Sequence, residues 1–251
     1  MKRWITGFFM AWGMFLSLPC PYRKWDEDAR PAMMAFLPVI GGIIGGIWAA
    51  AAWLLRQFPC PPAIRSLLLT ALPWMLTGFL HLDGYMDVCD AVLSRRDLET
   101  RKKILKDSHC GAFSVICLGL LMLAQWSLFF SGQRISLLGL FLIPVASRAC
   151  ASLAVTSLRP MGTSQYAGLP HRGLQPGQAF VVLALLACIA LPLLCGKRAA
   201  LGPLAAAVVY GLSAWHGIRQ LGGISGDISG FALTLGELAG VASLVLMGGA
   251  A

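Results

Sequence analysis

Three aspartates stand close together in a chain that has few acidic residues. Asp83, Asp87 and Asp90 lie within eight positions, whereas the whole sequence of 251 residues has only 11 Asp and Glu. Their i, i+4, i+7 spacing places all three on one face of a helix. Carboxylates held that close repel one another and resist ionisation unless a positive charge compensates them. A divalent cation supplies that charge, and all-oxygen ligands favour Mg²⁺, or Mn²⁺, over zinc and copper. The spacing therefore predicts a metal site, against the alternative of a solvated acidic helix face.

The aspartate helix belongs to a very apolar chain. Hydrophobic residues make up 57% of the sequence and charged residues 12%, and the mean hydropathy is +0.73. A soluble domain has a more polar composition than this. Apolar runs long enough to cross ~30 Å of hydrocarbon recur along the chain. We therefore expect an all-α, polytopic integral membrane helix bundle that forms a single domain over residues 1–251. The eight cysteines show no metal-binding spacing and predict packing residues rather than a disulfide framework.

About seven spans are expected, after an N-terminal segment that is short and rich in aromatic residues. Residues 1–18 predict an interfacial or re-entrant helix, and no small-x-small cleavage site precedes Pro19, which favours a retained segment over a signal peptide. The first span contains a group of glycines whose i, i+4 spacing permits close helix contact: Gly41, Gly42, Gly45 and Gly46. The spans are expected at residues 33–55, 64–82, 113–130, 135–153, 179–194, 199–216 and 228–247.

Charge is distributed unevenly between the two ends of these spans. Fifteen of the 20 Lys and Arg, counting Arg148 and Arg172, are assigned to the side that carries the N-terminus and the aspartate helix. The positive-inside rule makes that side cytoplasmic and places the C-terminus outside. All acidic residues but Glu237, which lies inside the last span, fall on the same side. No basic soluble domain is visible, which argues against a nucleic-acid partner.

Four polar segments would then meet on one membrane face. Carboxylates together with arginines and lysines suit a metal-bridged phosphate, so this face is the expected active site. A pump or channel would more often bury its charges at the middle of the bilayer. The segments are the aspartate helix and residues 106–111, 159–173 and 219–227.

Three motifs, in order along the chain, resemble those of the cobalamin synthase family, the adenosylcobinamide-GDP ribazoletransferases. HLDGYMDVCD at residues 81–90 resembles the family's HLDGxxDxxDG, and KDS at 106–108 with GAF at 111–113 resembles KDSxxGAFG. Residues 219–227 resemble R-x-x-GG-x-TGD. The resemblance covers nearly the whole chain. Ala91 replaces a glycine, His109 an arginine and Ser225 a threonine, and none of these changes removes a predicted metal ligand.

The resemblance implies a Mg²⁺-dependent transferase of late cobalamin (vitamin B12) biosynthesis in the bacterial inner membrane, with its active site on the cytoplasmic face. The 3′-hydroxyl of α-ribazole, or of its 5′-phosphate, would attack the phosphorus attached to cobinamide in adenosylcobinamide-GDP and release GMP. The residues assigned to catalysis are Lys106 and Arg219 as phosphate clamps, Asp107 as general base or further ligand, and Asp227. Those assigned to substrate binding are His81, Arg101, Arg148, Arg172, Gly222, Gly223, Gly226 and Glu237.

Several of these roles keep an alternative. The three glycines are expected to bring backbone N–H groups to phosphate where a helix begins, with Asp227 either part of the site or a helix cap alone. His81 lies opposite the aspartates on the helical wheel, so a packing role competes with a catalytic one. Glu237, ~15 Å below Asp227 by helical rise, is expected to face the corrinoid. No Lys or Arg is expected at its depth, and a protonated acid bonded to Thr234 is the alternative.

Two other classes of protein share some of these features. A CDP-alcohol phosphotransferase also has an aspartate cluster at the membrane edge, but its DGxxAR pattern fails here because Asp87 and Val88 occupy the Ala-Arg positions. A transporter would place charges within spans and show internal symmetry, whereas the sequence indicates one intramembrane acid and no repeat. Membrane lipid is a further expected partner. Homo-oligomerisation, contact with other late enzymes of cobalamin biosynthesis, and the choice between free and phosphorylated ribazole stay open.

Overall fold

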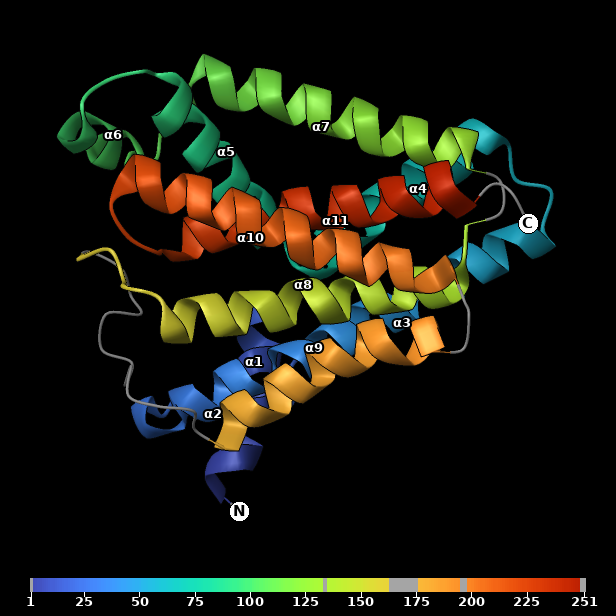
Figure 1. Cartoon of the computed structure of the whole chain (residues 1–251), viewed down its shortest axis with the longest axis horizontal. Coiled ribbons are helices and arrows are strands. Elements are labelled where there is room, and N and C mark those ends of the chain that lie inside the picture. Colours follow the sequence, from blue (N-terminus) through green and yellow to red (C-terminus); the bar gives the residue numbers. More distant parts are fainter. Residues whose placement is uncertain (1, 133–134, 163–175, 195–197, 249–251) are drawn as a thin grey trace.

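The computed structural model describes residues 2–132, 135–162, 176–194 and 198–248, and within them the chain forms eleven α-helices and no β-strand. Most of the long helices run side by side along one direction, with α8 near the centre of the bundle (Figure 1). The helices are α1 (Lys2–Phe15), α2 (Arg30–Ala35), α3 (Leu37–Gln57), α4 (Pro62–Leu76), α5 (Leu80–Leu93), α6 (Leu98–Ile104), α7 (Ala112–Ser131), α8 (Leu137–Ser157), α9 (Pro176–Leu194), α10 (Leu201–Leu221) and α11 (Gly226–Gly248).

The expected membrane architecture is confirmed. Helices α3, α7, α8, α9, α10 and α11 are each long and apolar enough to cross a bilayer, and α4 with α5 adds a seventh crossing if the bent pair counts as one. The span expected at residues 64–82 is wrong at its end, because α4 stops at Leu76 and the chain turns by 93° into α5. Gly78 and Phe79 both adopt left-handed conformations, with φ of 57° and 63°, and this breaks the helix.

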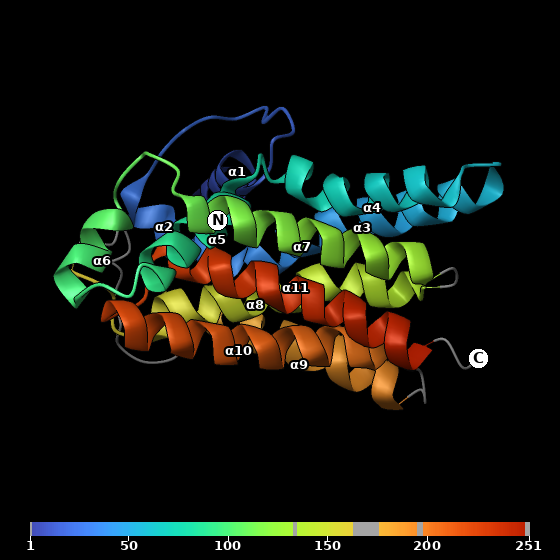
Figure 2. The same cartoon turned by 90° about the horizontal axis from the view of Figure 1, so that it is seen from above.

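Helix α1 lies across the direction of the long helices, as two perpendicular views show (Figures 1 and 2). Its 14 residues rise only ~21 Å, which is too short to cross the hydrocarbon core. Just after its end, the hydroxyl of Ser17 donates a hydrogen bond to the carbonyl of Met75, at 2.7 Å. Helix α1 therefore agrees with the interfacial alternative, and it is attached at the break between α4 and α5.

Close packing around α8 depends on glycine. A Cβ atom on Gly41 would overlap the carbonyl oxygen of Pro144, and one on Gly45 would overlap that of Phe141. Without side chains at these two positions, the α3 backbone lies directly on α8, as glycine pairs permit in membrane helices. Gly42 and Gly46 face open space, as expected for positions that miss the contact face. The expected tight packing of this helix is confirmed for two of its four glycines.

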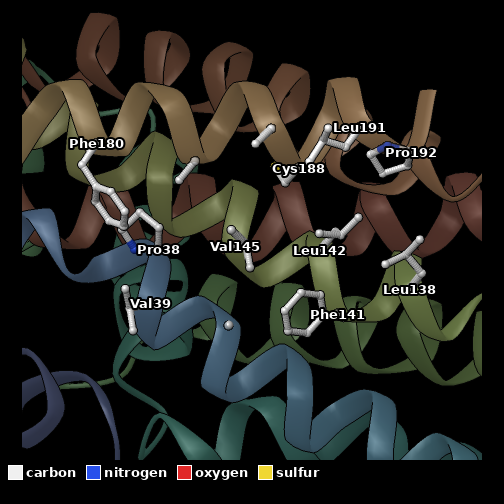
Figure 3. Close-up of a pocket in the computed structure, with 13 residues that line it drawn as sticks. Pro38, Val39, Leu138, Phe141, Leu142, Val145, Phe180, Cys188, Leu191 and Pro192 are labelled. Atoms are coloured by element: carbon white, nitrogen blue, oxygen red, sulfur yellow. The ribbon is translucent and has the colours of Figure 1, made fainter. Parts of the chain in front are cut away.

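An apolar groove of about 500 Å³ lies between α3 and α9, and α8 forms its base (Figure 3). Val39 of α3, Phe141 of α8, and Phe180 and Leu191 of α9 are among its lining residues. Apart from the thiol of Cys188, its lining side chains are hydrocarbon. Such a surface suits lipid chains and cannot bind a metal-bridged phosphate. The polar chemistry predicted from the sequence must therefore lie elsewhere.

The polar connections gather at one end of the bundle. The α5–α6–α7 connections, the end of α8 and the α10–α11 turn lie together, whereas the α3–α4 connection, the end of α7 and the start of α8 lie at the opposite end (Figure 1). The amide of Ile224 donates to the carbonyl of Arg159, and the amide of Met161 donates to that of Ile224, each at 2.9 Å. Arg101 of α6 donates to the side-chain amide oxygen of Gln220. The expected meeting of distant segments is thus confirmed for the described residues, and Arg172 lies outside them.

Candidate functional site

Helix α5 carries all three predicted metal ligands, as the spacing predicts. Asp83 is exposed, and Asp87 and Asp90 are half-buried. Asp87 lies within electrostatic reach of Asp83, Asp90 and also Asp227, which comes from the first turn of α11. The site therefore contains four carboxylates from two helices. Asp90 faces the start of α7, where a Cβ atom on Gly111 would overlap its carboxylate.

The two carboxylate-bearing helices approach each other at Gly84. A Cβ atom at this position would lie 2.8 Å from the Cα atom of Asp227 and 2.9 Å from its carbonyl oxygen. Any larger residue would therefore push the α5 backbone away from α11. Because Gly84 follows Asp83 directly, the lack of a side chain there brings Asp83 and Asp227 onto the same cavity.

Ser225, not Asp227, caps α11. The Ser225 hydroxyl accepts a hydrogen bond from the amide of Ile228 at 3.2 Å, which is the N-cap geometry for a helix that begins at Gly226. The same hydroxyl donates to Oδ2 of Asp227 at 3.3 Å. The alternative in which Asp227 serves as a cap alone is therefore wrong. Its carboxylate is oriented by the cap residue and borders the cavity described next.

A cavity of about 80 Å³ lies beside the carboxylates, enclosed by α1, α2, α3, α5, α8 and α11. His81 belongs to its lining, and its imidazole stacks on Phe15 with ring centroids 6.3 Å apart. The Nδ1 atom of His81 is buried and has no hydrogen-bond partner among the described residues. The polar residues of the lining are His81, Asp83, Arg148, Asp227 and Ser229.

Arg148 is a membrane-embedded residue, which corrects its assignment to the charges of the cytoplasmic side. It lies within α8, its side chain is 2% exposed, and its Nη1 donates to Oε1 of Glu237 at 2.5 Å. The expectation that Glu237 has no cation at its depth is therefore wrong. Thr234 is not its partner either, because that hydroxyl donates to the carbonyl of His81. Glu237 lies behind Arg148 and is not among the residues that line the cavity.

Asp107 lies in the exposed connection before α7 and is not among the residues that line the cavity. Its Oδ1 accepts a hydrogen bond from the amide of His109 at 3.0 Å and lies 2.6 Å from the His109 Nδ1. Hydrogen bonding from His109 lowers the pKa of Asp107, and the Asp107 carboxylate raises the pKa of His109 above its usual 6.5. In this arrangement Asp107 is a weaker proton acceptor than a free carboxylate.

Apart from Arg148, none of the Lys and Arg residues predicted for the site lines this cavity in the part of the chain that the structure describes. Arg219 is exposed and stacks on Trp215, with its guanidinium carbon 4.7 Å from the ring centroid. Lys106 is exposed on the surface, and Arg101 is engaged by Gln220. The structure thus places Arg148, rather than these three residues, against the cavity that Asp83 and Asp227 share.

The glycine segment divides into separate roles. Gly222 ends α10 with φ of 86°, and its amide donates to the carbonyl of Ile218 at 2.8 Å, so this N–H is not available to phosphate. Gly223 packs on the backbone at Met161, where a Cβ atom would lie 2.6 Å from the amide nitrogen. Gly226 alone of the three borders the cavity. The expectation that all three glycines offer N–H groups to phosphate is therefore wrong for Gly222.

The donor set at this site fits Mg²⁺. Carboxylate oxygens are the ligands that Mg²⁺ prefers, and it usually takes one or two of them together with water and substrate phosphate. Among the described residues, no three acidic, thiol or imidazole groups are close enough to form a preassembled metal cluster. A site that is completed by water and substrate oxygens needs no such cluster.

Known proteins resemble this chain over most of its length. The family model for Cobalamin-5-phosphate synthase matches residues 7–245. A Clostridium perfringens protein named adenosylcobinamide-GDP ribazoletransferase is 36% identical over 245 residues, which cover 96% of this chain and 98% of the relative. Proteins of the same name are 35% identical over 251 residues in Clostridium botulinum, covering 98% of this chain and 99% of the relative, and 32% identical over 242 residues in Deinococcus radiodurans, covering 94% and 84%. No solved structure is significantly similar to it.

Proposed function

The chain belongs to the cobalamin-5-phosphate synthase family, and from this premise we propose that it joins adenosylcobinamide-GDP to α-ribazole or α-ribazole 5′-phosphate. The observation that carries the proposal is one cavity at the polar end of a membrane bundle, bordered by Asp83, Asp227 and Arg148. Acids and a buried cation on one small cavity suit transfer at a charged phosphorus centre.

The reaction exchanges one phosphorus–oxygen bond for another. The 3′-hydroxyl of ribazole forms a bond to the phosphorus that bears cobinamide, and its proton passes to water. The bond from that phosphorus to the bridging oxygen breaks, and this oxygen departs as part of GMP. Such a displacement needs in-line positioning of the two oxygens and neutralisation of the charge on the diphosphate.

The residues have distinct parts in this proposal. Asp83, Asp87 and Asp90 of α5 and Asp227 of α11 are the carboxylates from which one or two would hold Mg²⁺, together with water and substrate oxygens. Bound Mg²⁺ would neutralise diphosphate charge. Ser225 orients Asp227 through its 3.3 Å hydrogen bond. Exposed basic residues, Lys106 and Arg219 among them, attract the anionic substrate to this end of the bundle.

The proposed location follows from the charge bias. Fourteen of the 20 Lys and Arg remain on the side of the aspartate helix after Arg148 is moved into the bundle. We place this end in the bacterial cytoplasm, with the bundle in the inner membrane. The soluble nucleotide product would then be released on the side where it is reused.

The test is product identity. Purified protein in nanodiscs is incubated with adenosylcobinamide-GDP, ribazole 5′-phosphate and Mg²⁺, and the products are identified by mass spectrometry. We expect GMP and a corrinoid that carries the ribazole in equal amounts. GMP without a joined corrinoid would indicate a hydrolase, and turnover of a CDP-alcohol substrate instead would refute the proposal.

A further inference from the structure

One nitrogen of the Arg148 guanidinium group pairs with Glu237, and another has no partner among the described residues. Its Nη1 donates to Oε1 of Glu237, and the Ser147 hydroxyl donates to the same oxygen at 2.9 Å. The side chains of Arg148 and Glu237 are 2% and 8% exposed. The Nε atom of Arg148 is buried and has no partner among the described residues. A guanidinium that served only this ion pair would have its remaining N–H groups satisfied as well, because buried donors are almost always paired.

The two side chains that carry these unsatisfied nitrogens line the same cavity. Arg148 and His81 both line it, and each has a buried nitrogen without a partner among the described residues. Asp83 and Asp227 border the same space. A ligand that enters therefore lies beside a guanidinium group and next to two carboxylates. An anionic phosphate oxygen suits the guanidinium group, and a cation held by the carboxylates would offset their charge toward it.

The size of the cavity limits the ligand further. Its volume is about 80 Å³, enough for a few water molecules. A phosphoryl group fits in that space, whereas a nucleoside or a corrin ring does not. Glu237 is also separated from the space by Arg148. These two observations argue against direct contact between Glu237 and the corrinoid.

We infer that Arg148 binds a non-bridging oxygen of the reacting diphosphate inside this cavity, and that Glu237 and Ser147 hold its guanidinium in place. This inference rests on the proposed function for the identity of the diphosphate. Arg148 is then a catalytic residue, because it contacts the group that reacts, and Glu237 is a positioning residue that acts through it. Buried in a water-poor environment, the cation stabilises developing charge more strongly than an exposed arginine would.

The test compares Arg148→Gln, Glu237→Gln and the double variant with a matched control. The control is Ser152→Ala, which removes another buried hydroxyl from α8 that donates to the carbonyl of Met34 and does not line the cavity. Each variant is studied in nanodiscs for Tm, for kcat and KM with both substrates, and for the rise in Tm on adding inorganic diphosphate with Mg²⁺.

The expected results separate catalysis from folding. Arg148→Gln should lower kcat by ~10²–10³-fold, the range for losing one preorganised donor, and Glu237→Gln by ~10-fold or more, as for loss of a supporting contact. Both single variants should lower Tm, because each leaves a buried partner unpaired, and the double variant should regain Tm. The double variant should keep the kcat of Arg148→Gln, and Ser152→Ala should keep wild-type kcat.

Other outcomes overturn the inference. Recovery of kcat together with Tm in the double variant would show that the pair serves folding alone. A raised KM for adenosylcobinamide-GDP in Glu237→Gln, with kcat unchanged, would support a corrinoid contact instead. The diphosphate measurement is independent of turnover. If the wild type binds diphosphate and Arg148→Gln does not, the anion site is supported. This holds even if the wild type does not make the joined corrinoid, a result that would refute the proposed function alone.

Discussion

Replacing Gly84 with alanine tests whether the contact between α5 and α11 positions the carboxylates. The new Cβ atom would lie 2.8 Å from the Cα atom of Asp227, and ordinary contact begins at 3.4 Å, so the backbones must separate by about 0.6 Å or more. Both partners are backbone and cannot rotate away. A misplacement on the order of 1 Å can cost ~10²-fold in rate, so we expect kcat to fall ~10–100-fold.

The stability change has two parts with opposite signs. Alanine favours a helix over glycine by about 1 kcal/mol, whereas overpacking of a tight contact costs about 1–3 kcal/mol. The net loss should therefore be at most about 2 kcal/mol, which is small enough to leave the bundle folded. The activity of Gly84→Ala should fall much more than its Tm does.

The assay measures GMP release and Tm for Gly84→Ala beside two glycine controls in α3. Gly46→Ala places its Cβ atom in open space and should change neither activity nor Tm by much. Gly41→Ala forces α3 away from Pro144 and should lower Tm while kcat falls less than in Gly84→Ala. Wild-type kcat in Gly84→Ala would refute the reasoning, because the carboxylates would then be positioned by something other than this contact.

Three further predictions concern the orientation in the membrane, the pairing of Asp107 with His109, and the cap of α11. With the native cysteines removed, Asp97→Cys should react with an impermeant maleimide only after the inner membrane is opened. Phe58→Cys should react in intact spheroplasts. The reverse labelling pattern would show that the orientation is opposite to the one proposed. Asp107→Asn should return the raised pKa of His109 toward 6.5, because the Asp107 carboxylate stabilises the protonated imidazole and the neutral amide does not. The pKa is measured by NMR on histidine-labelled protein, and an unchanged value would refute the pairing. Ser225→Ala should destabilise the protein by about 1 kcal/mol through loss of the cap and lower kcat, whereas Ser225→Thr should restore both, and equal activity of the two variants would argue against orientation of the site by this hydroxyl.

Much of the fold could be predicted from the sequence because hydropathy alone marks membrane helices. Runs such as 113–130 and 179–194 leave no alternative to a buried or lipid-facing helix, and they match α7 and α9 within a few residues. The break before α5 was harder to predict. It depends on left-handed backbone at Phe79 as well as Gly78, and a non-glycine residue rarely adopts that conformation.

The site was predictable where local spacing decides it. Asp83, Asp87 and Asp90 share a helix face because helical geometry dictates it, and Asp227 was assigned to the site through a motif. The contact of Arg219 with Trp215 could have been predicted in the same way, because residues four apart on one helix are neighbours.

The buried ion pair was a missed signal rather than a hidden one. Arg148 lies inside the run 135–153, and Glu237 lies inside 228–247. Opposite charges within two predicted spans are expected to pair, because each is costly alone in hydrocarbon. Because Arg148 was counted with the charges outside the spans, this pairing with Glu237 was not predicted. The position of Arg148 next to His81 around one cavity could not be read from the sequence, because it depends on how six helices pack.

The rate of GMP release with and without Mg²⁺ tests the central claim most directly, because it asks whether the carboxylate cluster and its metal perform the transfer. EDTA should stop the wild-type protein, and added Mg²⁺ should restore it. Asp83→Asn, Asp87→Asn and Asp227→Asn keep the shape of each side chain but remove its charge, so each should lower the rate ~100-fold or more with little change in Tm. Full activity in EDTA, or near-normal rates in all three variants, would contradict the account.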